Sequence, residues 1–289
     1  MSASTLRAAG MVTLVVAALL GSAYALGRSL VPDHPHRDTG VAASVHAPHY
    51  GDQPPSTDFP GPPAGGYGGP SPDASPSAPA DARQADDSEG PYGARTSTGS
   101  ARIALTFDDG PDPHWTPQVL ALLKEYGVKA TFCVVGENAE NHPDLVRSIV
   151  ADGHTICNHS WNHDITLGKR SPDAIRDDLL RTNDAIRAAA PGARIEYFRQ
   201  PGGAWTYPVV STCEELGMTP LHWAVDPTDW QAPGAARIET AVLAQTGPGS
   251  IVLMHDAGGD RSGTVEALQH LLPELLDRFQ LEALPTGTT

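Results

Sequence analysis

From residue 101 onward, short apolar runs alternate with longer segments of helical character, and this alternation restricts the fold more than any other feature. The apolar runs are too short for amphipathic helices and predict buried strands. We expect six of them, at 103–107, 130–135, 154–157, 197–198, 219–225 and 250–254. Repeated alternation of strands and helices favours an α/β domain with a parallel sheet.

The segments between these runs carry helix start and stop signals. In the first, Thr116 suits the N-cap, Pro117 the first helical position and Gly127 the stop. Further helices are expected at 143–152, 171–190, 206–216, 235–245 and 263–278. The alternating region, residues 101–285, is short for a complete eightfold barrel of about 250 residues. We therefore predict a distorted, incomplete (β/α) barrel of parallel strands.

The N-terminal hundred residues have a different composition. In residues 1–26, Arg7 precedes an apolar run at 10–26 that ends near a small-x-small site, the pattern of a secretory signal peptide. This run of 17 residues is slightly short of the roughly 20 needed to span a bilayer, and an uncleaved membrane anchor remains the alternative. Residues 27–100 are rich in Pro, Gly and Ser and predict a disordered linker. Either alternative predicts a secreted or membrane-anchored protein with an extracellular 101–285 domain.

Charge and cysteine content narrow the possible partners and bonds. A net charge of −15 makes nucleic acid an unfavourable partner, and we expect a monomer. Three cysteines are too few for a disulfide scaffold, so one bridge or none fits. Cys133 and Cys157 fall in the second and third expected strands, and a disulfide between them is a hypothesis. Two small buried apolar side chains are the alternative.

Polar clusters follow the expected strands at their carboxyl ends, where parallel α/β folds assemble their sites. They are Asp108-Asp109, 159–163, 199–203, 226–230 and His255-Asp256. Side chains alternate along a strand, so one of two adjacent aspartates can bind a cation while the other faces a substrate. An isolated Asp-Asp-Gly also suits a simple turn.

His159 and His163 are four residues apart, which aligns two imidazoles on one helical face or across a tight turn. With one carboxylate they form an Asp, His, His ligand set that leaves coordination positions open. A pair of surface histidines is the alternative, and the nearby Asp108-Asp109 argues against it.

Together the clusters resemble the five ordered motifs of the polysaccharide deacetylases, the NodB-homology or carbohydrate esterase family 4 enzymes. The resemblance covers about residues 102–284. The motifs are Thr106-Phe107-Asp108-Asp109-Gly110, His159-Ser160-x-x-His163, Arg199-x-Pro201, Asp226-x-x-Asp229-Trp230 and Leu253-x-His255. Any one of them is weak, but five in order are specific.

The resemblance implies a role for each motif. Asp109, His159 and His163 would hold a divalent metal, most often Zn²⁺, with Co²⁺, Ni²⁺ or Mn²⁺ as alternatives. Asp108 would be the general base and His255 the general acid.

It also implies that Arg199 and Asp229 form a charged pair that tunes the base and the acid. Trp230 and Leu253 would wall the acetyl methyl group, and a backbone N–H near Gly202 would face the oxyanion. A structural ion pair and plain core packing are the respective alternatives.

Two departures from the family pattern stand out. The family often has Tyr where this chain has Gly202, so an aromatic wall is missing. The chain after Arg278 is also short, which predicts a stunted closing strand.

The expected function is therefore an exported, metal-dependent deacetylase of N-acetylated glycans, with peptidoglycan or chitin-type N-acetylglucosamine as substrate. An acetylxylan O-acetyl esterase is the alternative within hydrolases, because the same chemistry cleaves esters. A cell-wall-binding protein with an inactive site is the alternative from another class.

Overall fold

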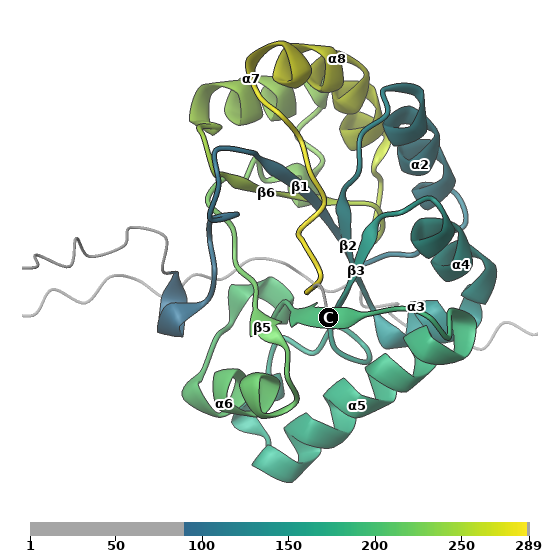
Figure 1. The fold of residues 1–289 in the computed structure, drawn as a ribbon, viewed down its shortest axis with the longest axis vertical. Helices are drawn as coiled ribbons and strands as arrows, with labels where there is room; N and C mark the ends of the chain where they lie inside the picture. Colours follow the sequence, from purple (N-terminus) through teal and green to yellow (C-terminus); the bar gives the residue numbers. More distant parts are fainter. Residues whose placement is uncertain (1–89, 288–289) are drawn as a thin grey trace, which may run out of the picture. The chain divides into compact units, whose positions relative to one another are not determined.

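The computed structural model describes residues 90–287, in which a curved sheet of parallel strands is surrounded by helices (Figure 1). Its strands pair in the order β5-β4-β3-β2-β1-β6, and every pair is parallel. Their bounds are β1 (Ala104–Asp108), β2 (Thr131–Val134), β3 (Thr155–Asn158), β4 (Ile195–Phe198), β5 (Thr219–Pro220) and β6 (Ile251–His255). The predicted distorted, incomplete barrel is confirmed. The predicted signal or anchor at 1–26, and the linker as far as residue 89, lie outside the described residues.

Six helices cover the outer face of the sheet, and each was expected from the sequence. They are α2 (Thr116–Glu125), α4 (Pro143–Ala151), α5 (Pro172–Ala189), α6 (Tyr207–Glu215), α7 (Ala235–Gln245) and α8 (Ser262–Arg278). The short helix α3 (Gly136–Asn141) was missed, because Gly and Asn are poor helix formers and no side chain caps it. Within residues 90–287, no helix has the length and apolarity needed to cross a bilayer.

The two faces of each strand pack into different environments. In β1, Leu105 and Phe107 join the large apolar core under the helices, whereas Ala104 belongs to a smaller cluster inside the barrel. Thr106 and Asp108 share the inward face with Ala104, because side chains alternate along a strand. The inner cluster also includes Cys133, Cys157, Tyr197, Leu221, Ile251 and Leu284. The barrel interior is therefore apolar beneath a polar carboxyl edge.

The predicted strand at 219–225 is broken in the structure. Only Thr219–Pro220 pairs with β4, after which Leu221 bridges to Arg95 and Val225 to Val252 of β6. Proline provides no N–H for a continuing ladder, and the chain changes its pairing partner there. Ser97 also bridges to Ser250. The packed part of the chain therefore begins upstream of residue 101.

The C-terminal segment crosses the barrel at the amino ends of the strands. Leu281 makes a single bridge to Ile103. Beyond it, the hydroxyls of Thr131 and Thr155 bond the backbone of Leu284, whose side chain is fully buried. The short tail therefore closes the end of the barrel opposite the polar edge.

Candidate active site

The two adjacent aspartates leave β1 in different directions, as expected. Asp108 ends the strand with its side chain in the barrel and lies in register with His255 of β6. Asp109 adopts a left-handed backbone conformation with φ of 74°, which is uncommon for a non-glycine residue and typical of functional turns. A Cβ atom at Gly258 would collide with the Asp109 carboxylate, so only glycine lets the loop after β6 approach this closely.

Asp109, His159 and His163 converge, as the sequence predicted. Oδ1 of Asp109 lies 3.4 Å from Nε2 of His159 and 3.2 Å from Nε2 of His163. The three ligand atoms all lie within 4.8 Å of one another. Burial would raise the pKa of Asp109, but the adjacent imidazoles hold it well below its usual range. The cluster therefore presents a carboxylate and two ring nitrogens to one point.

This geometry fits a divalent cation. Oxygen and nitrogen ligands about 2.0–2.1 Å from a tetrahedral zinc ion lie about 3.3 Å from each other, close to both measured distances. Oδ1 of Asp109 is buried and has no hydrogen-bond partner among the described residues. A cation bound between this oxygen and the two imidazoles would offset the cost of burying the carboxylate.

The loop after β3 holds the two imidazoles across a tight turn rather than along a helix. Ser160 and His163 both have positive φ, at 63° and 56°. The carboxamide of Asn158 accepts a hydrogen bond from the Ser160 N–H, 2.9 Å away. Nδ1 of His159 lies 2.8 Å from the carbonyl oxygen of Arg199. This bond fixes the ring, so that Nε2 faces Asp109.

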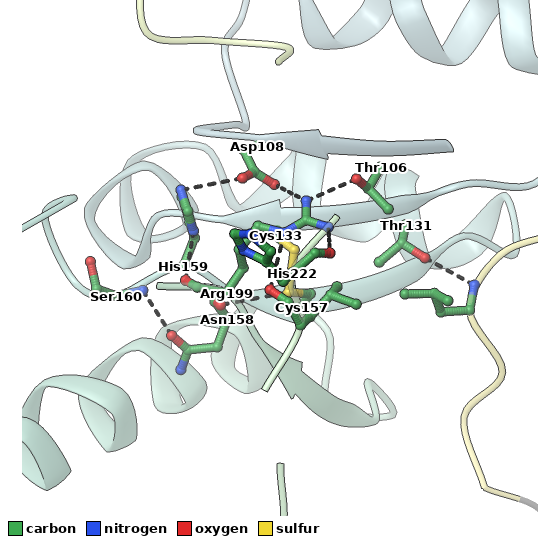
Figure 2. Close-up of a disulfide and its surroundings, with 12 residues drawn as sticks. Thr106, Asp108, Thr131, Cys133, Cys157, Asn158, His159, Ser160, Arg199 and His222 are labelled. Atoms are coloured by element: carbon green, nitrogen blue, oxygen red, sulfur yellow. Dashed lines mark hydrogen bonds and ion pairs between the residues drawn. A yellow bond between two sulfur atoms is a disulfide. The ribbon is translucent and has the colours of Figure 1, made fainter. Parts of the chain in front are cut away.

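Arg199 is fully buried inside the barrel and pairs with Asp108. Its Nη1 donates to Oδ1 of Asp108 at 2.7 Å and to the Thr106 hydroxyl at 2.8 Å (Figure 2). Its Nη2 donates to the carbonyl oxygen of His222. The other oxygen of Asp108 lies 3.6 Å from Nε2 of His159. Arg199 therefore fixes the predicted base beside the predicted metal ligands.

Asp229 pairs with His255 instead of with Arg199, so the predicted Arg199–Asp229 pair is wrong. Oδ1 of Asp229 lies 2.7 Å from Nδ1 of His255, and Oδ2 accepts from the His255 N–H at 2.9 Å. Burial would lower the pKa of His255, but the Asp229 carboxylate and the more distant Asp109 and Asp108 raise it to about 9. With Nδ1 directed at Asp229, Nε2 is left to donate a proton.

The three predicted substrate-contacting residues lie on separate segments. Gly202 lies in the turn η3 (Pro201–Gly203) with φ of 61°, and Trp230 lies in η4 (Asp229–Gln231), next to Asp229. Leu253 is buried and shares a face of β6 with His255, two residues away. A Cβ at Gly202 would come within 3.2 Å of a methyl group of the exposed Ile165. An aliphatic side chain therefore lies close to the position where the family often has an aromatic one.

Two supporting residues had no role predicted from the sequence, namely Asp256, which was noted only as part of the last polar cluster, and Asn138. Asp256 is buried against Gly110 and accepts a hydrogen bond from the Thr116 hydroxyl at 2.5 Å. Burial raises its pKa to about 7, to which Asp109 and Asp108 also contribute. Asn138 of α3 donates to the Asp109 carbonyl oxygen. Asp256 directly follows His255 of the last motif, and this position was the only indication in the sequence that it lies near the site.

The second and third strands are joined by a disulfide, as hypothesised. Cys133 and Cys157 are paired in register on β2 and β3, with Cα atoms 4.2 Å apart. Both are fully buried within the barrel, as Arg199 is (Figure 2). Cys213 is a buried free thiol.

A curved parallel sheet that carries an Asp, His, His cluster, an arginine-paired aspartate and an aspartate-paired histidine at its carboxyl edge is an arrangement suited to a hydrolytic enzyme. Residues 95–221 match the family model described as polysaccharide deacetylase. The chitooligosaccharide deacetylase of Bradyrhizobium sp. (strain ANU 289) is 42% identical over 200 residues, which cover 65% of this chain and 91% of the relative. The chain belongs to the polysaccharide deacetylase family.

Solved structures agree with this assignment. One is a peptidoglycan N-acetylglucosamine deacetylase in complex with 4-naphthalen-1-yl-N-oxidanyl-benzamide, with a TM-score of 0.62 and 36% identity over 65% of this chain and 88% of that one. Another is a mutant of a pseudoenzyme of carbohydrate esterase family 4 with restored enzymatic activity. It has a TM-score of 0.60 and 31% identity, covering 65% of this chain and 67% of that one.

Proposed function

We propose that this protein hydrolyses the acetamido groups of N-acetylated glycans, either chitin-type oligomers or peptidoglycan. The observation that carries the proposal is the convergence of the Asp109, His159 and His163 cluster with two differently paired groups, Asp108 and His255, at one edge of the sheet. The relatives named above as chitooligosaccharide and peptidoglycan deacetylases support this substrate class.

Asp109, His159 and His163 would hold a divalent cation, most favourably Zn²⁺, because one carboxylate and two imidazoles suit it. When bound, such a cation polarises the acetyl carbonyl and lowers the pKa of water. Co²⁺, Ni²⁺ and Mn²⁺ are the alternatives that the same ligand set accepts.

Asp108 and His255 divide the proton transfers between them. Asp108 accepts the proton of the attacking water, and Arg199 keeps its carboxylate oriented for this. His255 stays protonated near neutral pH because Asp229 stabilises the imidazolium. Its Nε2 then donates to the nitrogen of the leaving amine, since Nδ1 is engaged by Asp229.

The remaining predicted residues orient the acyl group. A backbone N–H at Gly202 would face the developing oxyanion. Trp230 and Leu253 would form the apolar wall for the acetyl methyl.

An acetate-release assay tests the proposal against its ester alternative. The purified, zinc-loaded protein is offered N-acetylglucosamine oligomers, peptidoglycan and acetylxylan. Release from either of the first two supports the deacetylase function. Release from acetylxylan alone overturns it in favour of an O-acetyl esterase, because the same proton transfers cleave esters.

An inactive wall-binding protein is the second candidate, since one structural neighbour is a variant of a pseudoenzyme. The presence of Asp108, His255 and all three ligands argues against it. Protein stripped of metal and then supplied with zinc separates the two. Restored acetate release excludes a pure binder, whereas glycan binding without any release supports one.

We also propose that the domain works outside the cytoplasm, following a signal or anchor at 1–26 and a linker that ends before Arg95, which already bridges to Leu221. The buried Cys133–Cys157 disulfide supports this, because disulfides persist mainly in oxidising compartments. Thiol titration of denatured, unreduced protein should find one free thiol. Three free thiols, or activity confined to the cytoplasmic fraction of the producing cells, would contradict it.

A further inference from the structure

Asp256, which follows the last motif, is a buried carboxylate that the chemistry proposed above does not use. Its side chain is fully buried, and none of the ion pairs within residues 90–287 includes it. Its Oδ2 accepts a hydrogen bond from the hydroxyl of Thr116, whereas Oδ1 has no partner in the described part of the chain. Aspartate is rarely fully buried unless it is paired, so the contacts that Asp256 does make are informative.

Asp256 contacts the residues on both sides of Asp109, the carboxylate of the predicted ligand set. Its backbone N–H donates to the carbonyl oxygen of Asp108 at 3.1 Å. Its carboxylate packs against Gly110, where an added Cβ atom would lie only 2.5 Å from each carboxylate oxygen. One residue of the loop after β6 therefore holds the backbone immediately before and immediately after Asp109.

A third contact runs through Thr116 at the start of α2. The hydroxyl of Thr116 donates to Asp256 and accepts from the N–H of Asp112 at 2.8 Å. The Thr116 N–H in turn donates to the carbonyl oxygen of Asp112 at 3.1 Å. These hydrogen bonds connect Asp256 with the far end of the loop that begins at Asp109. The loop is thus held at both ends.

The loop includes a backbone conformation that needs this support. Asp109 has a φ of 74°, and a left-handed conformation at a residue other than glycine persists only where the surrounding structure determines it. The direction in which the Asp109 side chain leaves the backbone depends on that conformation. Contacts behind a metal ligand orient the ligand and affect how tightly the metal binds.

We propose that Asp256 and Thr116 act together as a positioning unit that orients Asp109 for metal binding. This role rests on the metal site of the proposed function and extends it to two residues outside the ligand cluster. The alternative is that both residues only stabilise the fold. A residue of that kind lowers the melting temperature and leaves the zinc affinity of the folded protein unchanged.

The test measures zinc affinity by competition with a zinc-sensitive chelating dye, together with thermal unfolding of the metal-free protein. Asp256→Ala and Thr116→Val each remove one partner of the hydrogen bond, and each should weaken zinc binding roughly three- to tenfold. Asp256→Asn removes the charge but keeps an acceptor, and Thr116→Ser keeps the donor. Both should bind zinc within about twofold of the parent protein, because the contact survives.

A double-mutant cycle shows whether the two residues act as a unit. The protein with both Asp256→Ala and Thr116→Val should bind zinc about as weakly as the weaker single variant, because either change already breaks the same contact. Thr131→Val is the control, since Thr131 is also fully buried and hydrogen-bonded but begins β2 at the opposite end of the barrel. It should lower the melting temperature and keep the parent zinc affinity.

Parent zinc affinity in both Asp256→Ala and Thr116→Val overturns the positioning role, even if both variants melt at a lower temperature. An Asp256→Asn protein that binds zinc as weakly as Asp256→Ala also overturns it, because loss of charge would then explain the effect. Losses that multiply in the double variant contradict joint action. If Asp256→Ala does not fold, Thr116→Val and Thr116→Ser decide the question.

Failure of the proposed function gives a different result. A parent protein that binds zinc but releases no acetate contradicts the proposed function alone, and the zinc affinities of the variants still decide the role of Asp256. A parent protein that binds no zinc overturns the metal site and the positioning role together.

Discussion

The two sides of the site satisfy their polar groups in opposite ways. On one side, the ligand atoms of Asp109, His159 and His163 lie within 4.8 Å of one another, and no donor among the described residues hydrogen-bonds Oδ1 of Asp109. On the other, each oxygen of Asp229 has a protein donor, from His255 and from Thr264. We therefore expect the first side to need a cation, whereas the carboxylate of the second is satisfied by protein donors.

In the proposed mechanism, this contrast separates the residues that bind the cation from those that transfer the proton. Asp108 lies between the two sides, with one oxygen on Arg199 and the other near His159. Variants of the ligand side should lose metal and activity together. Variants of the paired side should keep metal and lose rate or change pH dependence.

The largest effect is expected from removing a ligand. His163→Ala should abolish stoichiometric zinc binding and lower kcat/KM about 10³-fold or more, because the cation stabilises transition-state charge by several kcal/mol. Metal analysis and acetate release measure both losses. His270→Ala, at an exposed histidine of α8, is the control and should change neither. Full activity of His163→Ala after exhaustive chelation would contradict the metal site.

Asp108→Asn should distinguish metal binding from proton transfer more sharply than removal of a ligand does. It keeps the shape of the side chain but removes the proton acceptor, so kcat should fall about 10²-fold. Zinc content should stay at the parent level, since Asp108 is not one of the three clustered ligands. A variant that lost both zinc and rate in parallel would place Asp108 among the ligands instead.

The next effect concerns pH. Asp229→Asn removes the charge that raises the pKa of His255 to about 9, so this pKa should fall toward its ordinary value. Because the acid must be protonated, the alkaline limb of the kcat profile should move to lower pH by about one unit or more. In Thr264→Val, which keeps the Asp229 carboxylate, the alkaline limb should stay near its position in the parent protein. If the alkaline limb of the kcat profile does not move in Asp229→Asn, His255 is not the general acid whose titration produces that limb.

The same pair predicts a pH-dependent stability. A folded-state pKa near 9, above the ordinary value of about 6.5, means that the pair stabilises the protein fully below pH about 6.5. This contribution is lost as the pH rises through about 9. Thermal unfolding should therefore show a large gap between parent and Asp229→Asn at pH about 6, and a smaller gap at pH about 10.

The sequence predicted the groups of the site better than their pairing. Asp109, His159 and His163 follow the carboxyl ends of expected strands, and that position places them at one edge of a parallel sheet. The partner of Arg199 depends on register and on which strand face points inward. Both Asp108 and Asp229 carry suitable carboxylates, and spacing along the chain does not distinguish them.

The elements that were not predicted from the sequence have local sequences that also suit other structures. Helix α3 lacks strong helix formers and a side-chain cap, yet its Asn138 holds the backbone of Asp109. Gly258 follows the last motif as one of many glycines, and its need for glycine becomes visible only from the nearby Asp109 carboxylate. The broken strand at 219–225 contains enough apolar residues to predict a continuous one, and Pro220 was its only warning.

The smallest expected effect, at Asn138, tests whether the metal-binding side and the proton-transfer side of the site are independent. Its side-chain nitrogen donates to the Asp109 carbonyl oxygen at 2.8 Å, which helps hold a left-handed backbone at this predicted metal ligand. Asn138→Ala should weaken zinc binding by a few-fold, because one hydrogen bond contributes about 0.5–1.5 kcal/mol. Competition with a zinc-sensitive chelating dye measures this shift. Asn141→Ala, at the exposed end of the same helix, is the matched control. If zinc binding is unchanged while the alkaline pH limit moves, the two sides are coupled through the β1 turn, and metal binding is not separate from proton transfer.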